Sequence, residues 1–477
     1  MSSHVDTYDT GMLHTKSPGD NWTGVSIDNT RRIFGIGDRV SELSPEQSLF
    51  FTYLTKVSKQ SIDDTVWKPL EYRHQWQRRN FVVDTTTGSV ASAGTTGVDE
   101  KVTMTGVKLQ CNYNKYGKIT STLNTPVFIV KNAMVALEVM PAGSGAVETK
   151  NFKVSAIDSS TGVATLVSVD TFSDAVEGTL ATFDGAKGQV IGSQWSEGSQ
   201  APDGWSDELS DTEFYSQIFK TSVPLMSGSA MATRYRGYAN EWKRIYSEHV
   251  MAHKMDIEHA MLFGKGAYYS QDDRYSWGIV PFIKEKGGKI YNMDYDGAVA
   301  SGDYGVGANK HLPFTYDGVV DLMEDFMAPE AGNSGQKLVL TSRKVIAKMS
   351  KLGTDSFVAK SLGDAGTSPF RANLDVKPSK FAPVDVTSLG TSFGSLNFVA
   401  HPLFRGQWED MAAVIDLSNV KYRPLAANGQ NRDTFVETNI QDNSTDGRKD
   451  QIITEAGLEV NLPETHALIN FSANASS

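Results

Sequence analysis

The stretch Tyr238–Phe263, YANEWKRIYSEHVMAHKMDIEHAMLF, lies between two glycines and itself contains neither glycine nor proline. A run of this length without a helix breaker predicts a single helix of about 39 Å, at roughly 1.5 Å per residue. Apolar side chains recur along it at spacings of three and four, at Trp242, Ile245, Tyr246, Val250, Ile257, Ala260 and Met261. Charged side chains fill the other side, at Glu241, Lys243, Arg244, Glu248, Lys254 and Glu258. The pattern therefore predicts that one face is buried against a large body and the other is solvated.

The composition is that of a folded chain with two or three domains, since 39% of the 477 residues are hydrophobic and 21% are charged. The net charge of −11 argues against a surface that grips nucleic acid by neutralising phosphates, so we expect any DNA contact to be indirect or local. Cys111 is the single cysteine, which excludes an intramolecular disulfide and a cysteine-based metal site. The sequence shows no signal peptide and no apolar run of about twenty residues, so we expect a cytoplasmic protein with no membrane partner.

The first forty residues are polar and show no helical or strand period, which predicts an extended arm that gains order against a neighbour. The basic pair Arg31 and Arg32 in this arm is either solvated charge or part of a contact with a partner. A capping box at Ser44-Pro45-Glu46-Gln47 then predicts the start of a helix. Its expected apolar face consists of Leu49, Phe50, Tyr53 and Leu54.

The segment from Asp63 to Val83 mixes aromatic and basic side chains. This mixture suits stacking on a nucleic acid strand, and it suits better an exposed hairpin that reaches across a protein interface, where Trp, Tyr and Arg are favoured. We take the protein interface as the working interpretation. The candidate assembly residues are Trp67, Tyr72, Arg73, Trp76, Arg78 and Arg79, together with Arg31 and Arg32.

The character of the chain changes between residues 85 and 193, where Gly, Thr, Ser and Val dominate. Alternating runs such as NFKVSAID, separated by turn-like segments, predict a small all-β domain of barrel or sandwich type inserted at about residues 125–192. After the long helix, helices at 317–327 and 342–352 and strands at 337–340, 396–400 and 412–417 predict an α/β lobe. The tail 451–471 predicts two strands divided near Pro463.

Several motifs match catalytic or metal-binding patterns only in part. His249 and His253 are four apart, as in zinc proteases, but HVMAH lacks the glutamate that follows the first histidine. The letters GTSFG around Ser392 match a hydrolase nucleophile elbow, yet a strand is expected after them where the elbow requires a helix. The stretches 292–303 and 442–447 resemble calcium loops without the terminal glutamate. We expect no metal, no cofactor and no enzymatic activity.

The order of these elements resembles the major capsid proteins of tailed double-stranded DNA phages, with the Hong Kong 97-type α+β fold and a β-domain insertion in its extended loop. The resemblance is carried by soft patterns, namely SQWSEGSQAP, FYSQIFKTSVPLMSGSAMA, DIEHAMLFGKG, RYSWGIVPFI, SFGSLNFVAHPLF and AAVIDLSNVKYRPL. It implies an N-terminal arm at 1–43, a joining helix at 44–61 and an extended loop with the β insertion at 62–193. It further implies a peripheral domain with the long spine helix at 194–290, an axial domain at 291–425 and return strands of the peripheral domain at 426–477.

The resemblance also implies the function. Copies of the chain would form hexamers and pentamers of an icosahedral shell, assembled in the host cytoplasm and present in the virion. The expected partners are a separate scaffolding protein, a portal, a decoration or cement protein, and packaged DNA through non-specific proximity. The alternatives are a hydrolase that uses Ser392 and another virion structural protein of the tail or fibre.

Overall fold

The structure is a computed structural model of the 477-residue chain. It describes residues 49–74, 79–84, 89–91, 103–139, 148–170, 185–201, 204–206, 208–235, 238, 240–294, 309–327, 335–355, 379–381, 384–391 and 393–471. Several sequence predictions lie outside these residues: the arm with Arg31 and Arg32, the capping box, Trp76, Arg78, Ser392 and most of the 292–303 stretch.

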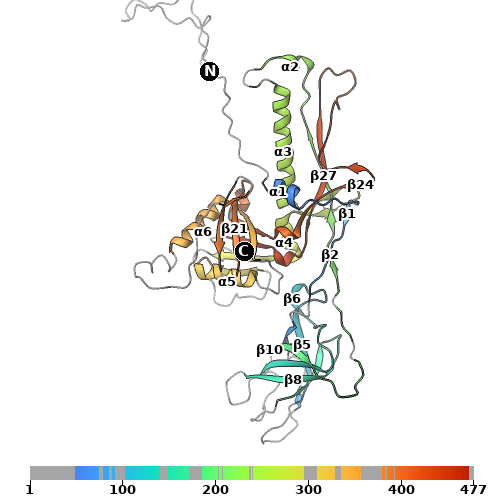
Figure 1. Ribbon diagram of the computed structural model, residues 1–477, viewed down its shortest axis with the longest axis vertical. Coiled ribbons are helices and arrows are strands. Elements are labelled where there is room, and N and C mark those ends of the chain that lie inside the picture. The colour runs from blue at the N-terminus through green and yellow to red at the C-terminus, as the bar shows by residue number, and fades with distance from the viewer. Residues whose placement is uncertain are drawn as a thin grey trace, which may run out of the picture.

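The long helix is present as α3, Glu241–Phe263 (Figure 1). It begins three residues later than the sequence pattern suggested, because the Asn240 side chain accepts a hydrogen bond from the Lys243 backbone N–H at 3.0 Å and caps the first turn. The predicted buried face is only half correct. The fully buried side chains all lie in the C-terminal half of the helix, at His253, Ile257, Glu258, Met261 and Leu262.

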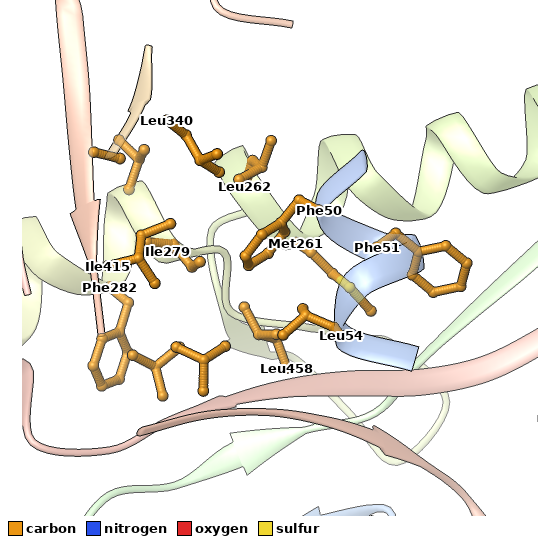
Figure 2. Packing of buried hydrophobic residues seen from close by; sticks show 14 of the residues in the cluster. Phe50, Phe51, Leu54, Met261, Leu262, Ile279, Phe282, Leu340, Ile415 and Leu458 are labelled. Carbon is orange, nitrogen blue, oxygen red and sulfur yellow. The ribbon is translucent and has the colours of Figure 1, made fainter. Parts of the chain in front are cut away.

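The main core forms where the C-terminal half of α3 meets α1 (Leu49–Val57) and α4 (Ile279–Lys286). Figure 2 shows Phe50 and Leu54 of α1 pointing toward Met261 of α3, while the ring of Phe51 lies on the other side of α1. There Phe51 packs edge-on against Tyr422, with ring centroids 5.4 Å apart. Phe51 is buried and Tyr53 is only half-buried, so the apolar face of α1 is rotated from the one expected. Through these side chains, α1 is packed against the centre of the molecule.

A four-stranded antiparallel sheet runs along α3. Its strands are β13 (Gln217–Ser222), β27 (Gln451–Val460), β23 (Val420–Pro424) and β26 (Phe435–Glu437), with β27 in the centre. Helix α2 (Gly228–Ala232) connects β13 to α3 at the upper end in Figure 1. The short hairpins β14 (Ala267–Tyr268) with β15 (Arg274–Tyr275), and β24 (Ala426–Ala427) with β25 (Gln430–Asn431), project from this part of the molecule.

The predicted α/β lobe is built on a mixed eight-stranded sheet of order β17-β16-β28-β22-β18-β21-β20-β19. The strands are β16 (Lys289–Asp294), β17 (Asn309–Pro313), β18 (Gln336–Thr341), β19 (Ser379–Phe381), β20 (Val384–Gly390), β21 (Ser395–Ala400), β22 (Met411–Ile415) and β28 (Ala467–Asn470). Helices α5 (Tyr316–Phe326) and α6 (Arg343–Asp355) pack on one face, and the main core lies on the other. Helix α6 continues two residues past Gly353, where the sequence suggested a stop.

Two domain boundaries differ from those expected. Strand β28 falls in the range assigned to the peripheral return strands, but it pairs with β16 and β22 of the lobe sheet. Strand β23 falls in the range assigned to the axial domain, but it pairs with β27 beside α3. The turn at the short helix Pro463–Thr465 sends the chain from one sheet into the other, which strand patterns alone do not reveal.

The β-rich segment forms a closed barrel with its own core at the lower end of the molecule in Figure 1. Strands β3 (Asn80–Asp84), β10 (Lys187–Ser193), β7 (Ala133–Val139), β8 (Glu148–Ile157), β9 (Val163–Ser168) and β5 (Thr103–Tyr113) follow one another around it, and β5 closes onto β3. Strands β4 (Ser89–Ala91) and β6 (Ile119–Asn124) add to β5. The expected start near residue 125 was too late, since β3 and β5 are needed for closure.

Candidate assembly interface

The barrel is joined to the body by two antiparallel limbs of chain. The outgoing limb carries β1 (Val66–Trp67) and β2 (Leu70–Glu71), and the returning limb carries β11 (Ser210–Asp211) and β12 (Phe214–Tyr215). Strand β1 pairs with β12, and β2 pairs with β11. The predicted hairpin within 63–83 is therefore wrong, because its strands pair with chain about 140 residues later.

The β2–β11 ribbon is inverted: apolar side chains lie on its exposed face and charged side chains on its buried face. Leu70, Tyr72 and Leu209 share one face by the strand alternation and the pairing register, and they are 68%, 45% and 53% exposed. The exposed Asp211 pairs with Leu70 and lies on the same face. Glu71 and Arg73 occupy the opposite face and are buried. The outer face is thus mostly apolar while the inner face carries buried charges, which makes the outer face a candidate surface for a protein contact.

Arg73 forms the centre of the buried face. Its Nη2 donates to Glu71 Oε2 at 2.7 Å and to Glu464 Oε2 at 3.0 Å, and its Nη1 donates to Ser210 Oγ at 2.8 Å. Desolvation acts to lower the pKa of the guanidinium, but the Glu464 and Glu71 carboxylates outweigh it and raise the pKa. Arg73 was a candidate for an intermolecular contact. It instead fixes the base of the limbs to the helical turn at 463–465 of the same chain.

The other described candidates have different environments. Trp67 stacks on Phe214 with centroids 6.0 Å apart and donates its Nε1 proton to Glu459 Oε2 at 3.0 Å, so it belongs to intramolecular packing. A Cβ atom at Gly457 would lie 2.5 Å from the Trp67 ring, which shows why that position in β27 lacks a side chain. Arg79 is half-buried at the entrance to the barrel, with a positive φ of 43°. Among the described candidates Tyr72 alone is exposed, and its place in an assembly contact stays a prediction.

The N-terminal half of α3 forms a second incompletely covered surface. At about 100° per residue, Lys243, Ser247, Met251 and Lys254 lie within about 80° of one another and continue the side that Met261 presents to the core. All four are exposed. In Figure 1, α1 covers only the lower end of the helix.

The β14–β15 hairpin is the third such surface. Tyr268, Tyr269 and Tyr275 are exposed, and Tyr269 is the most exposed of them at 78%. Tyr268 lies against Tyr215 at 5.6 Å, and Tyr269 lies edge-on to Tyr275 at 5.9 Å. These tyrosines were not among the candidates predicted from the sequence, although the pair Tyr268-Tyr269 between Gly266 and an acidic turn is a visible aromatic signal.

The histidine pair on α3 serves packing. His253 is buried, with Nδ1 2.8 Å from Thr221 Oγ1 and Nε2 2.8 Å from Thr454 Oγ1, and desolvation lowers its pKa. His249 Nδ1 lies 2.8 Å from the Ile245 carbonyl. Within the described residues, no group of three or more His, Cys, Asp or Glu side chains is placed to hold a metal ion.

The GTSFG turn connects two antiparallel strands, β20 and β21. The Thr391 N–H donates to the Gly394 carbonyl at 2.9 Å across the turn. A nucleophile elbow needs a strand followed by a helix, so this context does not fit one.

No helix among the described residues is both long and apolar enough to cross a membrane.

Glu258 is a further residue that the helical pattern placed wrongly. It was expected on the solvated side of α3, but it is 0% exposed. Its Oε1 accepts hydrogen bonds from the Phe50 backbone N–H at 2.9 Å and from His401 Nε2 at 2.6 Å. His401 Nδ1 accepts from the Leu403 N–H at 3.2 Å, which leaves the ring proton on Nε2. One carboxylate thus joins α1, α3 and the chain after β21.

Three exposed surfaces thus stand out on this elongated α+β molecule: the outer face of the β2–β11 ribbon, the N-terminal half of α3 and the tyrosines of the β14–β15 hairpin. Such surfaces are typical of the class of subunits that complete their packing in a larger assembly. The profile of the SU10 major capsid protein family matches residues 23–473, so the chain belongs to this family. The resemblance drawn from the sequence is confirmed by this match.

Solved structures similar to this chain have low identity. The capsid of a native GTA particle is 10% identical over 93% of this chain and 97% of the other, with a TM-score of 0.39. A Mycobacterium phage Patience structure is 14% identical over 60% and 78%, with a TM-score of 0.39. The capsid of Myoviridae phage XM1 is 13% identical over 58% and 81%, with a TM-score of 0.37. Among curated proteins, none matches the chain significantly.

Proposed function

We propose that this major capsid protein closes its shell by placing the apolar face of its β2–β11 ribbon against a neighbouring copy. The shell is icosahedral, built from hexamers and pentamers, and encloses the double-stranded DNA of a tailed phage. The protein has a structural role in the virion.

The observation that carries the proposal is the inverted ribbon. Fully burying a leucine side chain contributes about 1.5–3 kcal/mol, so Leu70 and Leu209 leave several kcal/mol unrealised in the isolated subunit. On the other face, Arg73 forms ion pairs with Glu71 and Glu464, which we call the Arg73 clamp. This clamp prevents the ribbon from turning over to bury the two leucines. A second copy can satisfy this face while the clamp stays intact.

The assignment of the remaining segments follows the expectations from the sequence. Residues 1–43 form the arm, residues 62–193 form the extended loop, and the barrel is the insertion that this loop carries. The partners are a separate scaffolding protein, a portal and a decoration protein, with assembly in the host cytoplasm. Packaged DNA is held by confinement, which is consistent with a net charge of −11. The Ser392 hydrolase alternative is disfavoured by the strand-turn-strand context of its motif.

The test is a change of polarity on the ribbon. A Leu70→Ser/Leu209→Ser chain should remain folded, because both side chains face solvent in the subunit, but it should fail to form particles in electron micrographs. A Leu70→Ile/Leu209→Ile chain keeps the apolar surface and should assemble. Normal particle formation by the serine variant would refute the role of the ribbon, and a monomeric wild-type chain in the presence of its scaffolding protein would refute the shell.

A further inference from the structure

The upper face of α3, defined by Lys243, Ser247, Met251 and Lys254, is basic and partly apolar. Neither lysine forms an ion pair within the described part of the chain. The acidic neighbours on this half of the helix, Glu241 and Glu248, are both occupied by Arg244.

The same side of α3 is covered in the C-terminal half of the helix. Met261 and Glu258 on this side pack against α1, and within the described residues α1 does not extend over the upper half of the helix. The upper face therefore continues a buried stripe into solvent. A surface of this kind suits an acidic partner with an apolar or aromatic contact at its centre.

The β14–β15 hairpin has the complementary chemistry. Its turn carries Asp272 and Asp273, which are exposed and form no ion pair with the described residues. Tyr268 and Tyr269 stand beside this turn and are exposed. Tyrosine is favoured at protein interfaces because its rigid ring supplies contact area and its hydroxyl supplies a hydrogen bond.

The two surfaces of one subunit cannot meet each other. Lys243 is about 31 Å along the helix axis from Gly264, where the hairpin leaves α3, at 1.5 Å per residue. The hairpin is also held in place by the stacking of Tyr268 on Tyr215 and by Arg274, whose Nη2 lies 3.3 Å from Glu455 Oε1. Complementary surfaces that are rigidly separated in one copy can pair only between copies.

We propose that the β14–β15 hairpin of one subunit docks on the upper face of α3 of a neighbouring subunit. Asp272 and Asp273 lie near Lys243 and Lys254, and Tyr269 packs on Met251. The contact joins two different surfaces, so it is heterologous and generates rings of subunits. The proposal rests on the proposed shell function and adds a defined contact to it.

A charge exchange tests the contact. Lys243→Glu/Lys254→Glu and Asp272→Lys/Asp273→Lys should each lower particle yield about tenfold, equivalent to about 1.4 kcal/mol. The chain that carries all four changes should recover to near the wild-type yield, because the charges are again opposite. Lys131→Glu, an exposed lysine of the barrel, is the matched control.

A cross-link gives a second readout that does not depend on yield. Chains with Met251→Cys and Tyr269→Cys together should form a ladder of covalent oligomers with a short bismaleimide in the assembled state. Chains with either cysteine alone should stay monomeric, because the contact is heterologous. Cys111 adds no background, since it is buried and desolvation raises its pKa to about 11.

The outcomes separate this contact from the shell itself. If the wild-type chain forms particles, but the four-change chain is not rescued and the double-cysteine chain forms no ladder, the hairpin contact is overturned. The shell itself is then unaffected. If the Lys243→Glu/Lys254→Glu chain assembles normally but its particles retain less DNA, the two lysines contact DNA. This result also overturns the hairpin contact. A wild-type chain that forms no particles, together with a double-cysteine chain that forms no ladder, overturns both.

Discussion

Buried charges at a few residues fix how the segments of this subunit join. Lys337 Nζ donates to Asp416 Oδ2 at 2.5 Å, and the Asp416 backbone N–H donates to His466 Nδ1 at 3.2 Å, all within the protein interior. Desolvation lowers the pKa of Lys337, while Lys337 and Ser418 hold the pKa of Asp416 below its usual value despite burial. Composition and periodicity did not indicate these pairs, because a pattern assigns charged residues to the surface.

His466 makes the fold acid-sensitive. Desolvation lowers its pKa from 6.5 to about 4 in the folded subunit. The unfolded chain therefore binds the proton first, and stability is lost as the pH falls from about 6.5 to about 4, by about 3 kcal/mol in total. Denaturant unfolding of His466→Gln between pH 7 and 4 should show a flatter dependence than wild type. His259→Gln, at an exposed position on α3, is the control for the loss of a histidine; equal slopes for wild type and His466→Gln would contradict the assignment.

Arg73 should be among the most sensitive single residues of the limbs. Replacing it with methionine leaves Glu71 and Glu464 buried without a counter-charge, which costs about 3–5 kcal/mol. We expect a clear drop in the thermal unfolding midpoint of the unassembled subunit. Lys68→Met, which removes the exposed pair with Glu213, is the control and should shift the midpoint little. Similar shifts in both variants would show that the clamp is not stabilising.

The elements were predicted with uneven success, for a physical reason. α3, α5, β18, β21 and the two tail strands followed from periodicity and breakers, because those signals are local. The pairing partners of several strands could not be predicted, because they lie far away in the sequence. The outgoing limb pairs with the returning limb, and β28 joins the sheet of the lobe. The buried half of α3 was also indistinguishable from the uncovered half, since the apolar spacing is the same along both and only tertiary packing separates them.

The attachment of α1 gives a prediction for these elements. Glu258→Ala removes the acceptor for the Phe50 N–H and for His401, and each buried group left unsatisfied costs about 1–3 kcal/mol. Amide exchange at Phe50 should become faster, and trypsin should cleave sooner after the exposed Lys56. Glu248→Ala, also on α3 but exposed, should change neither rate. Unaltered protection in Glu258→Ala would show that hydrophobic packing alone holds α1.

The whole molecule consists of a body and a barrel with separate cores. The barrel closes on itself through β3 and β5, so its backbone pairing does not depend on the body. The sequence did indicate a β-rich unit here, but closure depends on pairs such as Val82 with Gln110 that no local pattern reveals. Of the described candidates for the assembly surface, Tyr72 is exposed, Arg73 is buried and Trp67 packs within the subunit, so the role of these residues between subunits stays a prediction.

The barrel should fold without the body. A chain comprising residues 79–194 should give a β-type circular dichroism spectrum and one cooperative unfolding transition. The reciprocal chain, with residues 80–193 replaced by a short Gly-Ser linker, should keep the α3 helical signal. A fragment that stays unstructured would show that the limbs, with Arg73 and the body behind them, are needed to hold the barrel together.

Asn80, at the start of β3, lies opposite Gln189 in the antiparallel pairing with β10, and β10 ends at Ser193, so the entry and exit of the barrel lie near each other. Adjacent entry and exit points make a segment replaceable without strain on its host. A foreign antigen or enzyme grafted between these two positions would be carried on the particle in as many copies as there are subunits. The geometry thus recommends this protein as a scaffold for multivalent display.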